Sequence, residues 1–242
     1  MPFEHYYLDT VARGGGQIGG DSDAGFSDDV TQPIQRIPEA HRQGFLVVGF
    51  FVSLRRVDMQ NPFIVGDRIY LRPLEMDDID SFITWLNDED VRHYLNRTSP
   101  LNRVREKDFV ENLYKDDRDI VLGIVLKEND QLIGNIALNK ISIPYRNAGL
   151  GIFIGDKDCW SKGYGTEALR LMMGHGFDQL NLHRIFLTVL SFNARAIRAY
   201  EKVGFKREGV FREHIYRDGK YHDIYYMGIL ESEWRDLNGK NL

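Results

Sequence analysis

From residue 68 onward, apolar and polar positions recur with the periods of strands and helices, and they predict an ordered series of elements. Alternation with a period of two marks a strand, and apolar positions three and four residues apart mark a helix. The predicted segments are the strand Arg68–Leu74, a helix capped by Asp77-Asp78 and extending through Leu86, the helix Val104–Tyr114, the strands Ile120–Lys127 and Gln131–Leu138, the strand Leu150–Gly155, a helix after Gly165, the strand Arg184–Leu190, the helix Ala194–Val203, and the hairpin strands Phe205–Tyr216 and Tyr221–Leu230. This order indicates a mixed α/β (α+β) fold, with a mostly antiparallel central sheet and helices on both faces.

The first sixty residues lack this periodicity. The segment 13–23 is too rich in glycine and polar residues to bury a face. We therefore predict an N-terminal extension over 1–60 that is partly flexible, followed by one domain over 61–242. The glycines of 14–19 match the spacing of a dinucleotide-binding loop, but that site needs a strand before it and a helix after it, and neither is predicted.

Composition excludes several classes of protein. The 242 residues carry a net charge of −5, which argues against a chain-wide affinity for nucleic acid. The longest apolar run, 45–54, is shorter than the ~20 residues that a membrane helix needs. Cys159 is the only cysteine, so no internal disulfide or four-cysteine metal site can form. We expect a cytoplasmic protein with no metal, no nucleic-acid partner and no membrane anchor.

The segment from Leu150 to Met173 holds the strongest functional signal. An apolar strand leads into the glycine-punctuated turn Trp160–Glu167, and the turn leads directly into a helical pattern. Such a turn presents free backbone N–H groups and the positive end of a helix dipole to one point, which suits a pyrophosphate. Lys162 adds one mobile positive charge. The structural alternative is a plain helix start, with glycines for tight packing.

Three segments in this order and spacing resemble the GNAT superfamily of acyl-CoA-dependent N-acyltransferases. They are Lys162–Ala168, Asn193–Phe205 and Tyr216–Asp223. The chain is most similar to the branch of ribosomal-protein N-terminal and spermidine or diamine acetyltransferases, and the likeness extends from about Arg68 to Trp234. It implies a GNAT-like fold with acetyl-CoA as the acyl donor. The cofactor-binding residues that it implies are Ile152, Phe153, Ile154, Trp160, Ser161, Lys162, Gly163, Tyr164, Gly165, Thr166 and Asn193.

The resemblance also implies how the donor is held. The turn would wrap the pyrophosphate of coenzyme A with its amides, because glycine lets the backbone approach an anion closely. The strand carrying 152–154 would splay from its neighbour, and its freed backbone groups would bind the pantetheine arm; a β-bulge could cause such an opening. Trp160 stands where the family usually has Arg or Gln, and we interpret it as a wall of the turn.

Transfer from a thioester to an amine poses two proton problems. An amine of pKa about 10.4 is neutral in only about one part in a thousand near pH 7, a penalty of roughly 4–5 kcal/mol. The departing thiolate needs a proton or a hydrogen bond. By the resemblance, Tyr200 lies beside the sulfur and is the predicted catalytic residue, donating a hydrogen bond that becomes a proton transfer late in the reaction. Asn193 would fix the helix start and bind the pantetheine arm.

The general base is left unassigned. Relatives often carry a glutamate on the central strand at the position that Gly149 occupies here, and no carboxylate can act from there. A water chain or an acceptor amine of lowered pKa would also suffice. The side chains that the fold could bring close are Glu75, His93, Glu213, His214, His222 and Asp223.

The predicted acceptor is a small-molecule or peptide amine: a polyamine, a protein N-terminus, an amino sugar or an amino-acid-like drug. The implied acceptor wall includes acidic residues that would attract a cation. Its members are Trp85, Asn87, Asp88, Glu89, Asp90, His93, Tyr94, His222 and Asp223. We expect direct N-acetyl transfer to a primary amine, without an acyl-cysteine at Cys159. A non-catalytic acyl-CoA-binding or sensing protein is the alternative, and a homodimer paired through the hairpin is left open.

Overall fold

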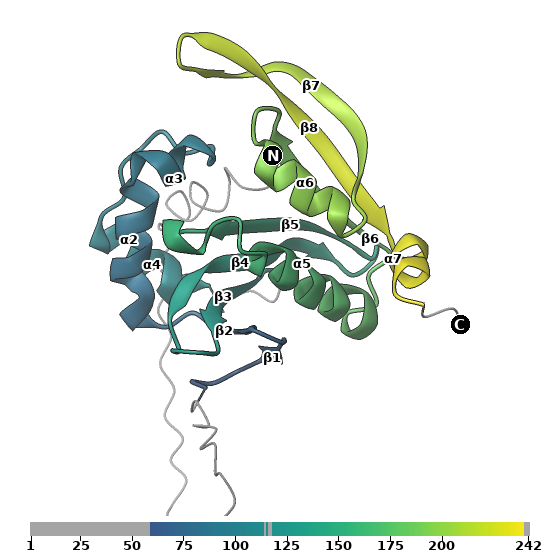
Figure 1. Ribbon diagram of the computed structural model, residues 1–242, viewed down its shortest axis with the longest axis horizontal. Helices are drawn as coiled ribbons and strands as arrows, with labels where there is room; N and C mark the ends of the chain where they lie inside the picture. The colour runs from purple at the N-terminus through teal and green to yellow at the C-terminus, as the bar shows by residue number, and fades with distance from the viewer. Residues whose placement is uncertain (1–58, 114, 116–117, 240–242) are drawn as a thin grey trace, which may run out of the picture. The chain divides into compact units, whose positions relative to one another are not determined.

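The structure is a computed structural model that describes residues 59–113, 115 and 118–239, shown in Figure 1. The predicted extension over 1–60 and its glycine-rich segment lie almost wholly outside the described residues. Every strand and helix predicted from residue 68 onward is present, and most of their ends differ from the predicted ends by a few residues. Six short elements of the described chain had not been predicted, because two to seven residues carry too little periodic pattern.

The bounds of the elements are as follows. The strands are β1 (Ile64–Val65), β2 (Ile69–Pro73), β3 (Ile120–Leu126), β4 (Leu132–Ser142), β5 (Asn147–Ile154), β6 (Arg184–Leu190), β7 (Lys206–Arg217) and β8 (Lys220–Leu230). The helices are α2 (Ile79–Asn87), α3 (Glu89–His93), α4 (Arg103–Asn112), α5 (Tyr164–Gly174), α6 (Ala194–Lys202) and α7 (Glu231–Leu237). Short helical turns occur at η2 (Met76–Asp78), η3 (Lys157–Cys159) and η4 (His175–Gln179). In the part of the chain that is described, no helix has the length and apolar character needed to cross a membrane.

The strands form one eight-stranded sheet in the order β1-β2-β3-β4-β5-β6-β8-β7. Neighbouring strands are antiparallel except β5 and β6, which are parallel. The crossover between these two runs through α5, as a parallel connection requires. The fold class predicted from the sequence, a mixed and mostly antiparallel sheet, is confirmed.

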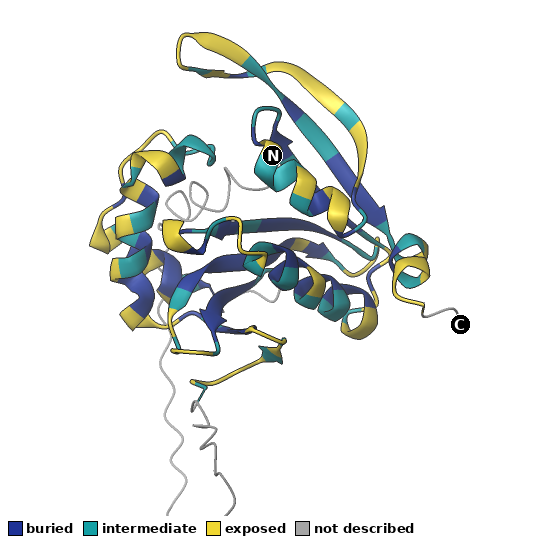
Figure 2. Ribbon diagram, in the orientation of Figure 1, coloured by how far each residue is buried: buried dark blue, intermediate teal, exposed yellow. Residues whose placement is uncertain are grey.

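Helices cover both faces of the sheet, as Figure 1 shows. On one face, which we call the α5–α6 face, Met172 and Tyr200 pack with Leu150, Leu187 and Met227 of the strands. On the other, the α2–α4 face, helices α2, α3 and α4 pack on Val121, Ala137 and Phe153. The buried residues in Figure 2 concentrate on the central strands, whereas the far part of the β7–β8 hairpin is largely exposed. The central strands therefore separate two apolar layers.

The start of α2 differs from the prediction that Asp77-Asp78 caps it. The 3₁₀ turn η2 precedes the helix: Asp78 forms a capping box with Glu75 at the start of η2 and makes no side-chain cap to α2 itself. Its carboxylate instead accepts two hydrogen bonds of 2.8 Å from the buried Arg72 and one of 2.8 Å from the backbone N–H of Glu75. A buried guanidinium without a partner would cost far more than one cap, so the ion pair takes the carboxylate.

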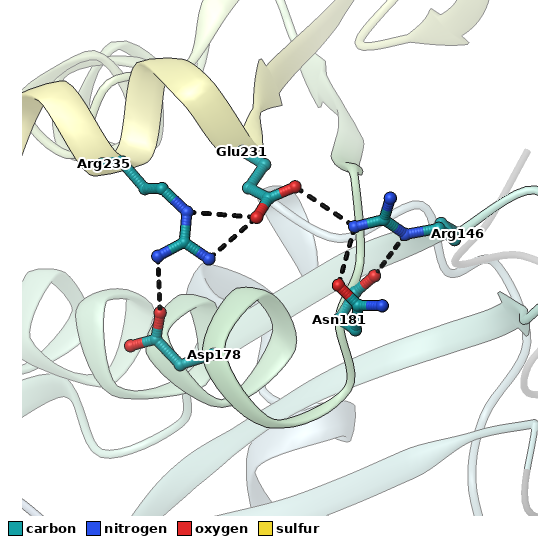
Figure 3. A network of polar contacts seen from close by, with 5 residues as sticks. All are labelled: Arg146, Asp178, Asn181, Glu231 and Arg235. Atoms are coloured by element: carbon teal, nitrogen blue, oxygen red, sulfur yellow. Dashed lines mark hydrogen bonds and ion pairs between the residues drawn. The ribbon is translucent and has the colours of Figure 1, made fainter. Parts of the chain in front are cut away.

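Strands β5 and β6 are fastened together where they begin. The carbonyl oxygen of Arg146 accepts hydrogen bonds from the backbone N–H groups of His183 (2.6 Å) and Arg184 (3.1 Å). The Arg146 side chain donates to the carbonyl and side-chain oxygens of Asn181 (2.7 Å each) and to Glu231 (3.2 Å), as Figure 3 shows. Arg235 then joins Glu231 to Asp178. This group of polar contacts, the fastened end, ties β5, β6 and α7 together.

The hairpin β7–β8 is tied to the α2–α4 face at its tip. The turn residues Asp218 and Gly219 have φ values of +51° and +78°, which match the tight hairpin turn predicted there. The preceding residue, Arg217, donates hydrogen bonds to the backbone carbonyls of His93 and, at 2.9 Å, Leu95. The hairpin is therefore held beside the end of α3.

Candidate active site

A gap opens between β5 and β6 beyond their fastened end. The two strands pair only at Asn147↔Arg184, Ala148↔Ile185 and Gly149↔Phe186. Beyond these pairs, β5 continues its pairing with β4 up to Ile154, and β6 continues with β8 up to Leu190. The two strands thus stay in the sheet but leave their facing edges unpaired. Unpaired strand edges offer backbone donors and acceptors to an extended ligand.

A β-bulge in β5 is not the cause of this gap. The register of β5 with β4 is regular from Gly134↔Ile154 to Asn139↔Gly149, and the irregularity between these strands lies at their other end. The strands instead diverge from a fixed point, because the fastened end holds their first residues together. The sequence argument that allowed a bulge in this strand is therefore wrong on that point.

A cavity of about 440 Å³ occupies the gap and is lined from both faces of the sheet. Leu169 and Tyr200 line it from the α5–α6 face, and Tyr94 and Ile224 from the opposite side. In the described part of the chain, all of the predicted site residues line this cavity except Lys162 and Tyr164. Those that do are Ile152, Phe153, Ile154, Trp160, Ser161, Gly163, Gly165, Thr166, Asn193 and Tyr200. Their roles stay predictions.

The turn before α5 is held in an unusual backbone conformation. Ser161 has φ +60° and Gly163 has φ +88°, the left-handed region that glycine adopts without strain. Arg68, the residue just before β2, fastens the turn: its guanidinium donates to the Lys162 carbonyl (3.0 Å), pairs with Glu167 (3.0 Å), and lies 4.7 Å from the centre of the Tyr164 ring. Tyr164 therefore supports the turn from outside, and the exposed Lys162 ammonium has no partner among the described residues.

The glycine at 165 leaves space on the cavity side of α5. A Cβ atom at Gly165 would approach Ile152 and Ile154 no closer than 3.9 Å, which is ordinary contact, so packing within the protein does not require glycine here. The first N–H groups of an α-helix have no acceptor inside the helix, and they carry the positive end of its dipole. An open wall beside these groups fits an anionic phosphate linker, so the residues present fit coenzyme A.

Tyr200 lies on α6 and turns toward the cavity. It is 7% exposed, and its ring packs edge-on against Phe205 at 5.9 Å. Burial raises the pKa of Tyr200, so the phenol keeps its proton throughout the physiological range. Among the described residues its hydroxyl has no hydrogen-bond partner, and burial is the sole cause of the pKa shift. This part of the chain thus presents to the cavity a protonated phenol that can donate to a ligand.

Asn193 caps the helix that carries Tyr200. Its side-chain oxygen accepts a hydrogen bond of 3.2 Å from the backbone N–H of Ala196, which is the cap expected for an asparagine at this position. The residue is buried and lines the cavity. Because its side-chain oxygen is used by the cap, the NH₂ group is the part left to meet a ligand.

Three basic residues of α6 line the cavity and had not been predicted. They are Arg195, Arg198 and Lys202, spaced so that they share one face of the helix. The Arg195 guanidinium lies 3.8 Å from the centre of the Trp160 ring and 5.1 Å from that of Tyr94. Burial lowers the pKa of Arg195, and its partners are aromatic rings rather than carboxylates. The spacing of these three residues, three and then four apart, was a sequence signal that could have identified this cationic face. The positive charges suit the phosphates of the donor.

The acidic part of the predicted acceptor wall lies elsewhere. The carboxylates of Asp88 and Asp90 both accept hydrogen bonds of 2.8 Å from the Lys157 ammonium, which lowers the pKa of Asp88. Trp85 packs beneath Gly155, so tightly that a Cβ atom on that glycine would lie 2.2 Å from the indole. In the region that the structure covers, Tyr94 is the one predicted wall residue that lines the cavity.

Cys159 lines the cavity but is a poor nucleophile. The thiol is buried, and burial raises its pKa to about 11, with Asp156 as a secondary cause. A thiol must ionise to attack a thioester. This agrees with the expectation of direct transfer rather than an acyl-cysteine.

Comparisons with known proteins agree with this geometry. The family described as the acetyltransferase (GNAT) domain matches residues 68–206, more than half of the chain. An uncharacterised N-acetyltransferase, YnaD of Bacillus subtilis, is 31% identical over 71% of this chain and 98% of its own. A spermidine N(1)-acetyltransferase of Vibrio cholerae is 28% identical over 70% of this chain and 97% of its own.

Solved structures give the same result. The crystal structure of spermidine N-acetyltransferase from Vibrio cholerae in complex with CoA and spermine superposes with a TM-score of 0.65, at 26% identity, and covers 69% of this chain and 98% of that one. The resemblance stated from three sequence segments is therefore confirmed. We conclude that the chain belongs to the GNAT acetyltransferase family and is an N-acetyltransferase that takes its acetyl group from acetyl-CoA.

Proposed function

We propose that this enzyme acetylates a primary amine by direct transfer across the gap between β5 and β6. The observation that carries the proposal is the cavity itself, because it joins the α5–α6 face to the α2–α4 face beside two unpaired strand edges. Acetyl-CoA supplies an activated acyl group. The turn before α5, the cationic face of α6 and Asn193 hold this donor from one side, and the amine approaches from the other.

In this proposal Tyr200 assists the leaving sulfur. Its phenol is protonated, lines the cavity and lacks a partner among the described residues. A hydrogen bond from it stabilises negative charge on sulfur, and proton transfer completes the departure. The raised pKa makes early proton transfer unfavourable, so the hydrogen bond acts first and the proton moves late.

The lining favours an amine on an apolar or aromatic body. On the side of α3 and the hairpin, the cavity is lined by Tyr94, Leu95, Asn96, Phe211 and Ile224. Among the described residues that line it, none is a carboxylate. A polyamine carries further ammonium groups, and a cavity without carboxylates gives them no counter-charge. We therefore propose a monoamine, or the N-terminus of an apolar peptide.

A polyamine is the second candidate, because relatives named as spermidine acetyltransferases share this fold and much of its length. The alternative stated from the sequence, a non-catalytic acyl-CoA-binding protein suggested by the missing carboxylate at Gly149, disagrees with the N-acetyltransferase relatives. Each predicts a different result with purified protein, and one panel of amines separates them.

The test measures free-thiol release from acetyl-CoA with tyramine, spermidine and an alanine-initiated peptide, and mass spectrometry identifies the product. We expect kcat/KM for tyramine or the peptide to exceed that for spermidine by about tenfold, which is about 1.4 kcal/mol of transition-state binding. Tyr200→Phe should lower kcat by about 100-fold and leave the calorimetric affinity for CoA unchanged. Spermidine as the only good acceptor would establish the polyamine reading, and CoA binding without turnover on any amine would establish the sensor.

A further inference from the structure

The residues that line the cavity include one side chain suited to accept a proton from an ammonium group. In the described chain, the titratable groups on the cavity besides His214 are the cations Arg195, Arg198 and Lys202, the phenols Tyr94 and Tyr200, and the thiol Cys159. Guanidinium and ammonium groups already hold their protons, and phenols and a buried thiol keep theirs near neutral pH. No carboxylate lines the cavity, so an imidazole remains.

A break in strand pairing turns His214 toward the cavity. Phe211 pairs with Ile224, and Ile215 pairs with His222, so β7 has two more residues than β8 between these pairs. In a regular strand, side chains three residues apart point to opposite faces. Phe211 and His214 nevertheless line the same cavity, with ring centres 5.6 Å apart. Bulges beside active sites commonly redirect a side chain in this way.

Asp223 of β8 holds the bulge in place. Its carboxylate accepts a hydrogen bond of 2.8 Å from the backbone N–H of Glu213, and its carbonyl accepts one of 3.0 Å from Ser191 at the end of β6. Glu213 has φ +50°, a left-handed conformation that a non-glycine residue adopts only when its surroundings impose it. The side chains of Arg212 and Glu213 are exposed. The left-handed conformation of Glu213 therefore acts on the next residue, because it sets the direction of the His214 side chain, which lines the cavity.

We propose that His214 is the proton acceptor for the amine, and that the Asp223-held bulge is the device that positions it. The proposal rests on the proposed function, since it presumes an ammonium substrate on the α2–α4 face. The sequence alone could not single out His214, because strand alternation places it opposite Phe211.

The proton balance is as follows. The ammonium gives one proton to the imidazole of His214 and becomes a neutral amine. The amine nitrogen forms a bond to the acetyl carbon, and the carbon–sulfur bond breaks with its electron pair on sulfur. Sulfur takes the proton of the Tyr200 phenol, and the second proton of the nitrogen returns to the Tyr200 phenolate by way of solvent. The proton on His214 passes to solvent, which restores both side chains.

The test compares wild type with His214→Gln across pH, on the best amine of the panel. At pH 7 we expect kcat/KM to fall by about 100-fold, with unchanged calorimetric affinity for CoA. The deficit should shrink as pH rises to 9.5, because a growing share of the amine is already neutral. Imidazole added to His214→Ala should restore part of the activity. His183→Gln changes an exposed histidine side chain just before β6 and keeps the backbone hydrogen bonds of His183 in the fastened end, so it is the matched control and should behave as wild type.

A second pair of variants tests the positioning device. Asp223→Ala removes the acceptor of the Glu213 N–H and should lower kcat about tenfold, whereas Asp223→Asn keeps an oxygen there and should recover most of it. If His214→Gln does not fold, the difference in kcat between Asp223→Ala and Asp223→Asn tests the proposal in its place. Equal activity of wild type and His214→Gln at pH 7, or a deficit that stays constant with pH, overturns the proposal. Failure of the proposed function looks different, because wild type itself would then acetylate no amine.

Discussion

At the scale of single residues, Glu106 on α4 is a buried acid that the cavity does not use. It is 0% exposed, and within the described part of the chain neither carboxylate oxygen has a hydrogen-bond partner. Burial raises its pKa to about 7, although the charge of Arg97 acts in the opposite direction. An acid whose pKa is higher in the folded state stabilises the protein less as pH rises, because the unfolded chain releases its proton first.

Glu106→Gln should therefore change how stability depends on pH. Between pH 4.5 and pH 8 we expect the wild type to lose about 2–3 kcal/mol relative to the Gln variant, since Gln mimics the protonated acid at every pH. Urea unfolding at a series of pH values measures this difference. Glu111→Gln, an exposed change on the same helix, is the control. Parallel stability curves for wild type and Glu106→Gln would rule out the raised pKa.

At the scale of elements, the turn before α5 is held by several contacts within the protein, whereas the side of α5 that faces the cavity is open. Arg68 and Glu167 fasten the turn to β2, whereas the side of Gly165 that faces β5 makes only distant contacts. Substitution at this glycine therefore separates the stability of the helix from its ability to hold a donor.

Gly165→Ala should make the protein more stable and bind acetyl-CoA less tightly. Alanine favours a helix over glycine by up to about 1 kcal/mol, and its Cβ atom meets no protein atom closer than 3.9 Å. The same methyl group occupies the cavity side of the helix, so we expect the Kd for CoA to rise about tenfold or more, equal to about 1.4 kcal/mol. Thermal unfolding and calorimetry measure the two effects.

Gly174→Ala provides the matched control at the other end of α5. There a Cβ atom would meet only Trp234, at 3.9 Å, and the site lies outside the cavity lining. Stability should change in a similar direction without a loss of CoA affinity. A Gly165→Ala protein that binds CoA as wild type does would mean that the donor does not pass beside this glycine.

Local patterns predicted the elements well and the contacts between distant elements poorly. Strand alternation and helical spacing located the helix of Tyr200 and the turn around Gly163, because their signals lie within a dozen residues. The buried pair of Arg72 and Asp78, which displaced the predicted cap, depends on tertiary burial that no window of sequence contains. The role proposed for His214 was equally hidden, since a bulge reverses the face that alternation assigns.

At the scale of the described domain, β5 and β6 are fixed at one end and separated at the other. Glu231 is central to the fixed end: it binds Arg235 and Arg146 (Figure 3), and Arg235 is the leading cause of the lowered pKa of Glu231. Contacts at this end decide where the strands begin to diverge, and hence where the gap starts.

Glu231→Gln should destabilise the protein by about 1–2 kcal/mol at pH 7, because two charge-assisted hydrogen-bond partners lose their anion. A lowered carboxyl pKa in the folded state stabilises the protein above the unfolded pKa, and this contribution disappears as pH falls through the folded value. The stabilities of wild type and variant should therefore converge below about pH 4. Urea unfolding across pH checks this, with the exposed Glu128→Gln as control. A constant difference down to pH 3 would contradict the assignment.

The lining of the cavity from both faces of the sheet carries a consequence for the order of events during turnover. In the proposed reaction the donor and the amine approach from opposite faces of the sheet, so neither blocks the other and both can be bound at once. Such a ternary complex needs no covalent acetyl-enzyme intermediate. In the proposed reaction the acetyl group then passes through the gap between β5 and β6, which the cavity occupies.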